Sequence, residues 1–461
     1  MASAAGQPNY GKFQVLKKRA LNPLLTYAYD PYDLYSMEAV DIKGKVVGFN
    51  YYESLYSPMV TASFLEVDTG GTVNSQKDDF AGTLKDGLPV KGFEEVLVKV
   101  NTKYVSLDWT KRNRRFVITG SPYNIDEGNR QTAYFPMVSI NAMKSTSKPV
   151  KQIYPEAKIS DIVKKILDDA KLPYKDENIE STQNSMKVDA QNENPLDTIL
   201  KLCPKSIPFG GQAGFFFYEN SEGYNFKSIH NMIKDGKEFL SSPERSINFR
   251  YIYERGLKAN LNNDDNDRHV LAPPTVRRDQ DQLNAIKMGI YNIKVCTRNI
   301  VTGEVTEEII NVYNNKSVET LGNKTKDDLN NDQTSSSNEG KNKNYCKTYT
   351  YQLIPGVTES GVSNEISNNP AKYHPQAIMR YGLIHAQLVN IIVPHNGNLT
   401  VGRCIRLAIE NVTADNKIEK KYNDHRSGDY LILHLCHAFT PTNSFTSLTL
   451  IRDEYGLPSK K

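Results

Sequence analysis

The chain has 461 residues, a length typical of about three domains. Hydrophobic residues make up 38% of it, enough for a sizeable core, but no apolar run approaches the roughly 20 residues that span a bilayer. The net charge of +4 is too small to indicate nucleic-acid binding by itself. Residues 1–11 lack the charged start and apolar run of a secretory signal, so we expect the chain to fold in a cytoplasm.

Cysteine usage argues against a disulfide framework and against a zinc site. The five cysteines, at positions 203, 296, 346, 404 and 436, are odd in number and show no CxxC spacing. We expect reduced and mostly buried thiols. The 27 tyrosines suit strands and protein–protein interfaces, where a rigid apolar ring with a polar tip is useful.

The N-terminal region, residues 1–147, shows the period-2 pattern of half-buried strands. Apolar residues alternate with polar ones over Val40–Lys45 and again over Glu95–Val100. Breaks between such strands are expected at Leu88-Pro89, Lys91-Gly92 and Ser121-Pro122. Consecutive antiparallel strands of this kind predict a barrel or a sandwich.

The middle region, residues 148–285, mixes helices with strands. Ser160 is predicted to cap a helix whose apolar stripe runs to Ala170, and Asn194 to cap a second helix that begins at Pro195. An aromatic hairpin is predicted over residues 214–229. It belongs to this intermediate α+β domain or to the barrel that follows.

The C-terminal region, residues 286–461, again predicts antiparallel strands. A hairpin is expected over 291–312 with its turn near Thr302-Gly303, and further strands over Ile384–Val393, 401–409, Tyr430–Phe439 and Phe445–Ile451. These favour a second barrel, because closure removes exposed sheet edges. Residues 314–344 are almost free of apolar side chains and are predicted to form a disordered polar surface insertion.

Motifs for chemistry are missing from the sequence. It contains no GxSxG, P-loop or HExxH pattern. His434 and His437 would lie on opposite faces of one strand, and Asn262–Asp267 lacks the glycine and glutamate of a calcium loop. We therefore predict no catalytic residue, no metal site and no cofactor.

The basic run Lys111–Arg115, beside Trp109 and Phe116, has two interpretations. It could face DNA or an acidic partner, or it could be the solvated tip of a hairpin. A single basic cluster in a nearly neutral chain favours the second interpretation. We expect neither a membrane nor a specific nucleic acid as a partner.

Three stretches, spread in order over most of the chain, resemble one protein family. They comprise Tyr51–Tyr56 with Val67-Asp68 and Gly87–Glu94; Asn194–Leu200 with Gly214–Glu219 and Tyr224–Ile229; and Val401-Gly402 with Ser427–Ile432 and Leu450–Asp453. Together they are similar to the central baseplate hub of contractile-tailed bacteriophages of the T-even type.

The resemblance implies a mainly β chain with two antiparallel, tube-like barrels joined by a mixed intermediate domain. It implies a homotrimeric ring in the virion tail that adapts a sixfold tail tube to a threefold central spike. The expected partners are a tail tube protein, a central spike protein and other baseplate proteins, and no enzymatic activity is expected. The residues carried over as fold-defining or interface candidates are Glu53, Ser54, Asp68, Pro89, Gly92, Glu94, Gly402, Ser427, Gly428, Tyr430, Arg452 and Asp453.

Two alternatives remain open from the sequence. A spike-associated cell-wall hydrolase would release fragments from peptidoglycan. A hub of the secretion-system spike type would usually continue into a β-helical needle. The chain stops at Lys461, ten residues after Ile451, so we expect a separate spike protein.

Overall fold

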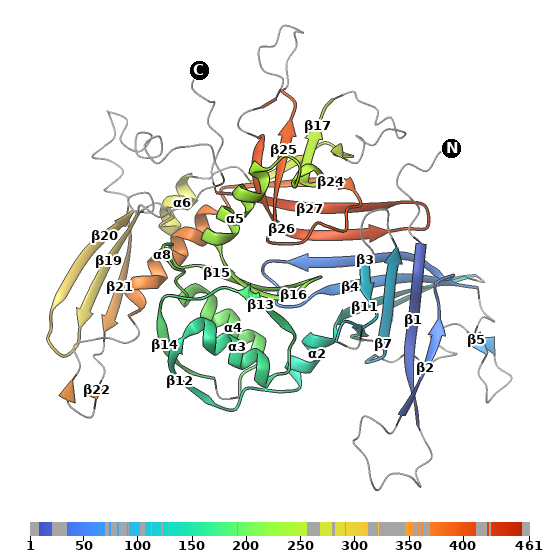
Figure 1. The fold of residues 1–461 in the computed structure, drawn as a ribbon, viewed down its shortest axis with the longest axis horizontal. Coiled ribbons are helices and arrows are strands. Elements are labelled where there is room, and N and C mark those ends of the chain that lie inside the picture. The colour runs from blue at the N-terminus through green and yellow to red at the C-terminus, as the bar shows by residue number, and fades with distance from the viewer. Residues whose placement is uncertain are drawn as a thin grey trace.

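Strands from both ends of the chain meet in one sheet in the computed structural model of the protein (Figure 1). The structure describes residues 9–20, 35–69, 73–74, 81–82, 90, 92–101, 107–111, 113–120, 123–128, 130–190, 192–255, 268–278, 282–290, 292–311, 321, 346–353, 357–358, 361–362, 369–411, 422–423 and 426–453. The described chain is mainly β with a mixed middle region, as the sequence predicts.

The N-terminal region contains eleven strands and one short helix among its described residues. They are β1 (Asn9–Ala20), β2 (Tyr35–Asp41), β3 (Val46–Ser54), β4 (Thr61–Asp68), β5 (Val73–Asn74), β6 (Ala81–Gly82), β7 (Glu95–Asn101), β8 (Leu107–Trp109), β9 (Phe116–Ile118), β10 (Tyr123–Glu127), β11 (Arg130–Ser139) and α2 (Ile140–Thr146). Strand β7 confirms the strand predicted over Glu95–Val100.

The strand predicted over Val40–Lys45 is wrong. Strand β2 ends at Asp41, whose side chain accepts a hydrogen bond from the Lys43 N–H at 3.0 Å. The Lys45 N–H then bonds the Ile42 carbonyl at 2.9 Å, which closes a turn before β3 begins at Val46. A local side-chain bond to the backbone thus overrides the alternating pattern.

The middle region packs two helices and a hairpin around a core of its own. Its elements are β12 (Ile153–Lys158), α3 (Ile159–Asp169), β13 (Tyr174–Ile179), β14 (Ser185–Asp189), α4 (Pro195–Leu202), η2 (Cys203–Lys205), β15 (Phe215–Asn220), β16 (Gly223–Ser228) and α5 (Ile229–Ser241). Asn194 caps α4 as predicted, with its Oδ1 accepting the Leu196 N–H at 2.9 Å.

The cap predicted for the first of these helices is wrong. Helix α3 begins at Ile159, so Ser160 lies inside its first turn and is buried. The Ser160 N–H donates to the hydroxyl oxygen of Thr182 at 3.1 Å. A residue distant in the sequence therefore satisfies a backbone group that is usually bonded by a local cap.

The remaining elements begin at the end of the middle region and continue through the C-terminal region. They are η3 (Ile247–Phe249), β17 (Arg250–Tyr253), β18 (Thr275–Arg278), α6 (Gln282–Met288), β19 (Asn292–Asn299), β20 (Val305–Asn311), β21 (Lys347–Leu353), β22 (Val357–Thr358), β23 (Gly361–Val362), α8 (Pro370–Leu383), β24 (Gln387–Pro394), β25 (Cys404–Ile409), β26 (Gly428–Phe439) and β27 (Ser444–Arg452). The predicted hairpin and the strands predicted over Tyr430–Phe439 and Phe445–Ile451 are confirmed, whereas the strand expected over 401–409 starts only at Cys404, because Val401 and Gly402 form a turn. The strand expected from Ile384 starts at Gln387, because α8 extends to Leu383.

The main sheet runs in the order β18-β24-β27-β26-β3-β4-β11-β9-β7-β1-β2. The two ends of the chain join where β26 pairs antiparallel with β3, from His434 opposite Ser54 to Phe439 opposite Phe49. Among the described strands neither terminal region is seen as a closed barrel, so closure and the domain boundaries stay predictions.

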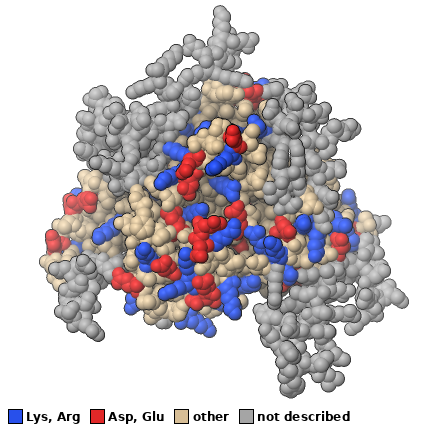
Figure 2. Space-filling view, viewed as in Figure 1, with Lys and Arg blue, Asp and Glu red and all other residues tan. Residues whose placement is uncertain are grey.

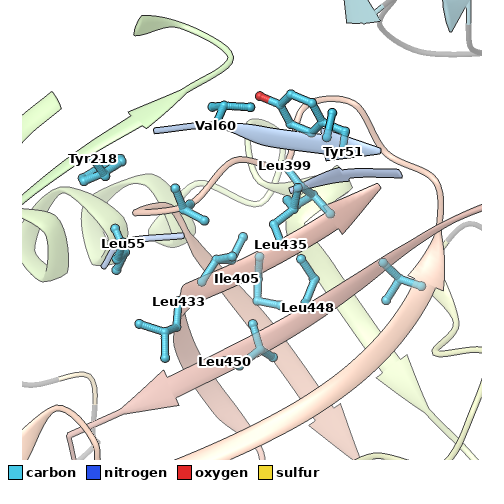
Figure 3. Close-up of a cluster of buried hydrophobic side chains, with 14 of the residues drawn as sticks. Tyr51, Leu55, Val60, Tyr218, Leu399, Ile405, Leu433, Leu435, Leu448 and Leu450 are labelled. Carbon is cyan, nitrogen blue, oxygen red and sulfur yellow. The ribbon is translucent and has the colours of Figure 1, made fainter. Parts of the chain in front are cut away.

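One hydrophobic core lies beneath the main sheet, and Figure 3 shows its side chains converging from β3, β26 and β27. Strand β15 belongs to two cores at once. Phe216 and Tyr218 pack into the main core, whereas Phe215 and Phe217 pack into the core of the middle region. Because side chains alternate along a strand, this one strand holds the middle region against the terminal regions.

Candidate functional site at the junction of the chain ends

Glu53 occupies the place where β3, the hairpin turn after β15 and the segment before β25 meet. Its Oε1 accepts hydrogen bonds from the Tyr51 hydroxyl at 2.6 Å and the Ser221 N–H at 2.8 Å. Its Oε2 accepts the Val401 N–H at 3.0 Å. The side chain is buried, and this burial raises the pKa of the carboxyl to about 7. One acidic group thus links three distant segments.

Glu219, on β15, makes the matching connection to the N-terminal region. Its Oε2 accepts the Val60 N–H at 3.0 Å and the Ser139 hydroxyl at 2.6 Å, while its Oε1 accepts the Asn141 side-chain amide at 2.9 Å. Burial raises the pKa of this carboxyl as well. We call Glu53, Glu219 and the groups bonded to them the carboxylate junction.

A second buried charged centre lies at the end of β27. Arg380 on α8 forms an ion pair with Asp453, with 3.4 Å between Nη1 and Oδ2, and both side chains are buried. Asp453 also accepts the Leu321 N–H at 2.8 Å. Burial raises the pKa of Asp453, and the positive charge of Arg380 opposes that rise.

The neighbouring Arg452 organises the turn before β26. It donates to the Ser427 carbonyl at 2.9 Å, and its guanidinium lies over the Tyr430 ring, 5.5 Å from the centroid. Gly428 has φ +142°, and a Cβ on it would stand 2.8 Å from the Arg452 guanidinium. Only glycine fits there. We call Arg380, Arg452, Asp453, Ser427, Gly428 and Tyr430 the arginine centre.

The structure brings half of the predicted residues together in these two places. Glu53 belongs to the carboxylate junction, and Ser427, Gly428, Tyr430, Arg452 and Asp453 belong to the arginine centre. Gly402 lies directly after Val401, and a Cβ on it would overlap the Tyr218 hydroxyl. It therefore shapes the contact between the hairpin and β25.

The remaining predicted residues have local roles. Ser54 accepts the Tyr56 N–H at 3.1 Å, and the buried Asp68 accepts a bond from the Lys45 ammonium at 3.1 Å. The Gly92 N–H donates to the Glu94 carboxylate at 2.9 Å, which forms a tight turn before β7. Pro89 lies outside the described residues. How far any of these residues contributes to an interface stays a prediction.

The basic run makes contacts within the molecule. Arg115 pairs with Glu95 at 2.7 Å, and Arg114 donates to the Ser221 carbonyl beside the carboxylate junction. Arg114 therefore ties the N-terminal region to the hairpin, whereas Arg115 makes an ion pair within the N-terminal region. The polar segment Asn262–Asp267 lies outside the described residues, as does all of 314–344 except Leu321, which is buried.

Among the described residues, no three His, Cys, Asp or Glu side chains group together as a metal site. His437 is buried and bonds the Thr446 hydroxyl at 2.9 Å, whereas His434 is exposed on the other face of β26. A cavity of about 210 Å³ lies between the hairpin, α5 and Gly402, and Glu222 is one of its lining residues. The Glu222 carboxylate forms an ion pair with Arg403 at 2.8 Å, so it is not a lone acidic group in the cavity.

In the described part of the chain, no helix has the length and apolarity to cross a membrane.

Most of the solvent side of the central sheet is free of formal charge over six strands, with Arg130 at the start of β11 as an exposed exception. Cross-strand neighbours place the residues in rows, and none of them is Lys, Arg, Asp or Glu. By contrast, Figure 2 shows acidic and basic side chains interspersed where α3 and α4 lie. We call this surface the uncharged face; its rows are Asn390, Thr449, His434, Ser54; Ile392, Ser447, Cys436, Tyr52, Thr61, Val138; Pro394, Phe445, Ala438, Asn50, Ser63, Pro136; and Leu65, Tyr134.

Sequence reasoning missed Glu219 and Arg380. A signal for Glu219 was present, because an acidic residue directly follows the run Phe215–Tyr218 in a strand that is buried at every position. Arg380 gave no such signal, because its helix was not predicted.

No protein-family model matches the chain. It is 20% identical, over 464 aligned residues, to the probable baseplate hub protein gp334 of Vibrio phage KVP40, covering 95% of this chain and 97% of that protein. The chain is a homologue of a phage baseplate hub protein. This confirms the resemblance drawn from the three stretches of sequence.

Two of the solved structures to which the chain shows similarity are tail proteins. A 43 kDa tail protein of prophage MuSo2 from Shewanella oneidensis is 10% identical with a TM-score of 0.47, over 97% of this chain and all of that one. A tail protein from Neisseria meningitidis MC58 is 9% identical with a TM-score of 0.46, over 90% and 94% of the two chains. Both TM-scores lie below 0.5. The similarity to baseplate hub proteins therefore rests on the sequence relationship to the Vibrio phage protein.

Proposed function

We propose that this chain is the structural hub at the centre of a contractile phage tail, where three copies form a ring between a sixfold tail tube and a threefold central spike. The relationship to a baseplate hub protein places it in the tail baseplate of a virion. The observation that carries the proposal is similarity over nearly the full length of both chains. Its partners would be further copies of itself, a tail tube protein, a central spike protein and other baseplate proteins.

The geometry supports a load-transmitting role. The carboxylate junction, the shared strand β15 and the β26–β3 pairing tie the chain ends and the middle region into one body. Such a body can transmit force between two partners, because burial of these polar groups makes relative sliding costly. No enzymatic step is part of this proposal.

Light scattering on the purified protein at micromolar concentration tests the ring, and a three-chain particle is expected. A persistent monomer would count heavily against it. Incubation with peptidoglycan tests the alternative of a cell-wall hydrolase. Release of fragments that is abolished by a single carboxylate substitution would replace the structural role with an enzymatic one.

A further inference from the structure

We propose that the cavity between the aromatic hairpin, α5 and the segment before β25 binds one ring of an N-acetylated sugar, the kind of ring that builds the glycan strands of bacterial cell walls. This site goes beyond the structural role and does not depend on the number of copies in the assembled tail. Four features carry the proposal: the walls of the cavity, an unpaired buried amide, the balance of charge and an apolar surface.

The cavity lies where three parts of the chain meet. One face of the sheet β13-β16-β15 forms its floor, helix α5 lies beside the hairpin (Figure 1), and Thr400–Cys404 forms the third wall. A Cβ on Gly236 would overlap the Cys404 side chain, so this glycine lets α5 approach β25 closely. The volume of about 210 Å³ lies below the range of about 300–1,000 Å³ for drug-sized ligands, so it suits a single ring.

Three buried asparagines line the floor of the cavity. Asn178 is 5% exposed, and its Nδ2 has no hydrogen-bond partner in the described part of the chain. Asn220 accepts the Glu222 N–H with its Oδ1 at 2.9 Å. Asn225 donates with its Nδ2 to the Gly223 carbonyl at 2.9 Å. These two local bonds fix the orientation of the amides and leave the other end of each for a ligand.

The floor therefore offers two N–H donors and one carbonyl acceptor to a ligand. The donors are the Nδ2 atoms of Asn178 and Asn220, and the acceptor is the Oδ1 atom of Asn225. A buried donor without a partner is unfavourable, because it has lost its bond to water and gained no other. A ligand that brings an acceptor to Asn178 relieves that cost on binding.

The charges among the described lining residues cancel. Two acidic side chains, Glu222 and Asp235, are balanced by two basic ones, Lys227 and Arg403. Arg403 and Glu222 pair with each other at the rim, where their side chains are 42% and 41% exposed. A lining without net charge gives no advantage to an anion or a cation, so a neutral ligand with several hydroxyl groups fits it better than a phosphate or a charged peptide.

An apolar surface completes the match with an N-acetylated sugar. Tyr218 of β15 and Met232 and Phe239 of α5 line the same cavity as the asparagines. A sugar ring has apolar C–H faces and polar edges, and its acetamido group places a methyl group beside a carbonyl acceptor. Aromatic and thioether side chains suit the apolar parts, and the Asn178 amide suits the carbonyl. An amide side chain of a partner protein would use the same groups and becomes an outcome of the test.

Calorimetric titration and saturation-transfer NMR with diacetylchitobiose test the site on the intact protein. This disaccharide of N-acetylglucosamine is expected to bind. Cellobiose, which has the same linkage but hydroxyls in place of the acetamido groups, should bind at least about tenfold more weakly, as should acetamide. Equal binding of the two disaccharides would overturn the assignment. Acetamide binding as strong as that of diacetylchitobiose would also overturn it, and would assign the cavity to an amide side chain of a protein.

Asn178→Leu removes the unpaired donor and keeps a similar volume. It is expected to weaken binding of diacetylchitobiose by about tenfold or more without lowering the melting temperature, because the donor makes no bond to a described residue of the free chain. Asn443→Leu, in the exposed turn between β26 and β27, is the matched control and should leave binding within about twofold.

Tyr218→Phe provides a second variant if Asn178→Leu does not fold. It keeps the ring and its packing and removes only the hydroxyl beside Gly402, so binding should weaken by about threefold or more. Unchanged binding in these variants would place the sugar elsewhere and overturn the site. Wild-type protein that binds no diacetylchitobiose also overturns it and leaves the hub function standing, because that function is tested by the number of chains in the particle.

Discussion

The carboxylate junction and the arginine centre bury charge in different ways. Glu53 and Glu219 have only neutral donors as hydrogen-bond partners: backbone N–H groups, hydroxyls and one amide. Asp453, by contrast, faces the guanidinium of Arg380. In the carboxylate junction, each carboxylate holds several chain segments together through hydrogen bonds from neutral donors. In the arginine centre, an ion pair between Arg380 and Asp453 does so.

This difference sets what each centre tolerates. A carboxylate held by neutral donors can take up a proton without leaving an opposite charge unpaired. A buried ion pair cannot lose one member without isolating the other. We therefore expect the arginine centre to be the less tolerant of the two to substitution and the carboxylate junction to be the more sensitive to pH.

The largest expected effect is that of Arg380→Met. It leaves Asp453 buried without its positive partner, which should lower the free energy of unfolding by about 3–5 kcal/mol. Denaturant titration followed by circular dichroism measures the loss. Lys175→Met, which removes an exposed ion pair with Glu177, should cost below about 0.5 kcal/mol.

A double variant decides whether charge is the cause. Arg380→Met combined with Asp453→Asn should recover part of the lost stability, because no isolated charge remains. If the double variant is as unstable as the sum of the two single variants, the arginine centre acts through packing alone.

Glu53→Gln is expected to have the next largest effect. The new amide replaces one acceptor oxygen with a donor, so either the Ser221 or the Val401 N–H loses its partner, at about 2 kcal/mol. Glu222→Gln is the matched control, because this exposed neighbour pairs only with Arg403 on the surface and should cost below about 0.5 kcal/mol. Equal losses in the two variants would contradict the role given to Glu53.

Acid should destabilise the folded chain through His395, which lies outside both centres. Its ring lies 4.8 Å from those of His437 and Phe439, neither ring nitrogen has a hydrogen-bond partner, and burial lowers its pKa from 6.5 to about 4. Between these values the unfolded chain binds more protons, so stability falls as pH drops, by about 2 kcal/mol at pH 5.

The raised pKa of Glu53 has the opposite sign. Its stabilising contribution is full below the unfolded value of 4.5 and disappears as pH rises through about 7. The difference between wild type and His395→Phe therefore isolates the histidine. Thermal unfolding from pH 7 to pH 4.5 should show a shallower decline in the variant, and parallel curves would refute the assignment.

The smallest expected effect lies at the rim of the arginine centre. Arg406 pairs with Asp429 through two bonds of 2.6 and 2.9 Å, but its side chain is 40% exposed. Arg406→Met should therefore cost about 1 kcal/mol or less. A loss as large as that of Arg380→Met would show that burial is not what separates the two ion pairs.

Local signals in the sequence predicted the local structure well. Asn194 followed by Pro195 identified the start of α4, and the aromatic run Phe215–Tyr218 identified the hairpin, because caps and alternation act within a few residues. Helix α8 was missed because Pro375 lies inside it, and proline in a helix interior usually marks a break.

Long-range features could not be predicted in the same way. Glu53 was found through a family resemblance, but its three partners come from β3, the turn at Ser221 and the segment before β25. Glu219 likewise depends on groups near Val60 and Asn141. Nothing in a local pattern specifies which distant donors will surround a carboxylate.

The β26–β3 pairing also sets the order in which the chain can fold. Ser54 and its partner His434 are 434 − 54 = 380 residues apart. At about 5–20 residues per second, ribosomal synthesis would leave the edge of β3 without its native neighbour for roughly 20–80 seconds. During that interval nascent chains on one polysome could pair with each other's β3 edges. Cotranslational production of this protein therefore favours early covering of the β3 edge, by packing of the N-terminal region or by a chaperone.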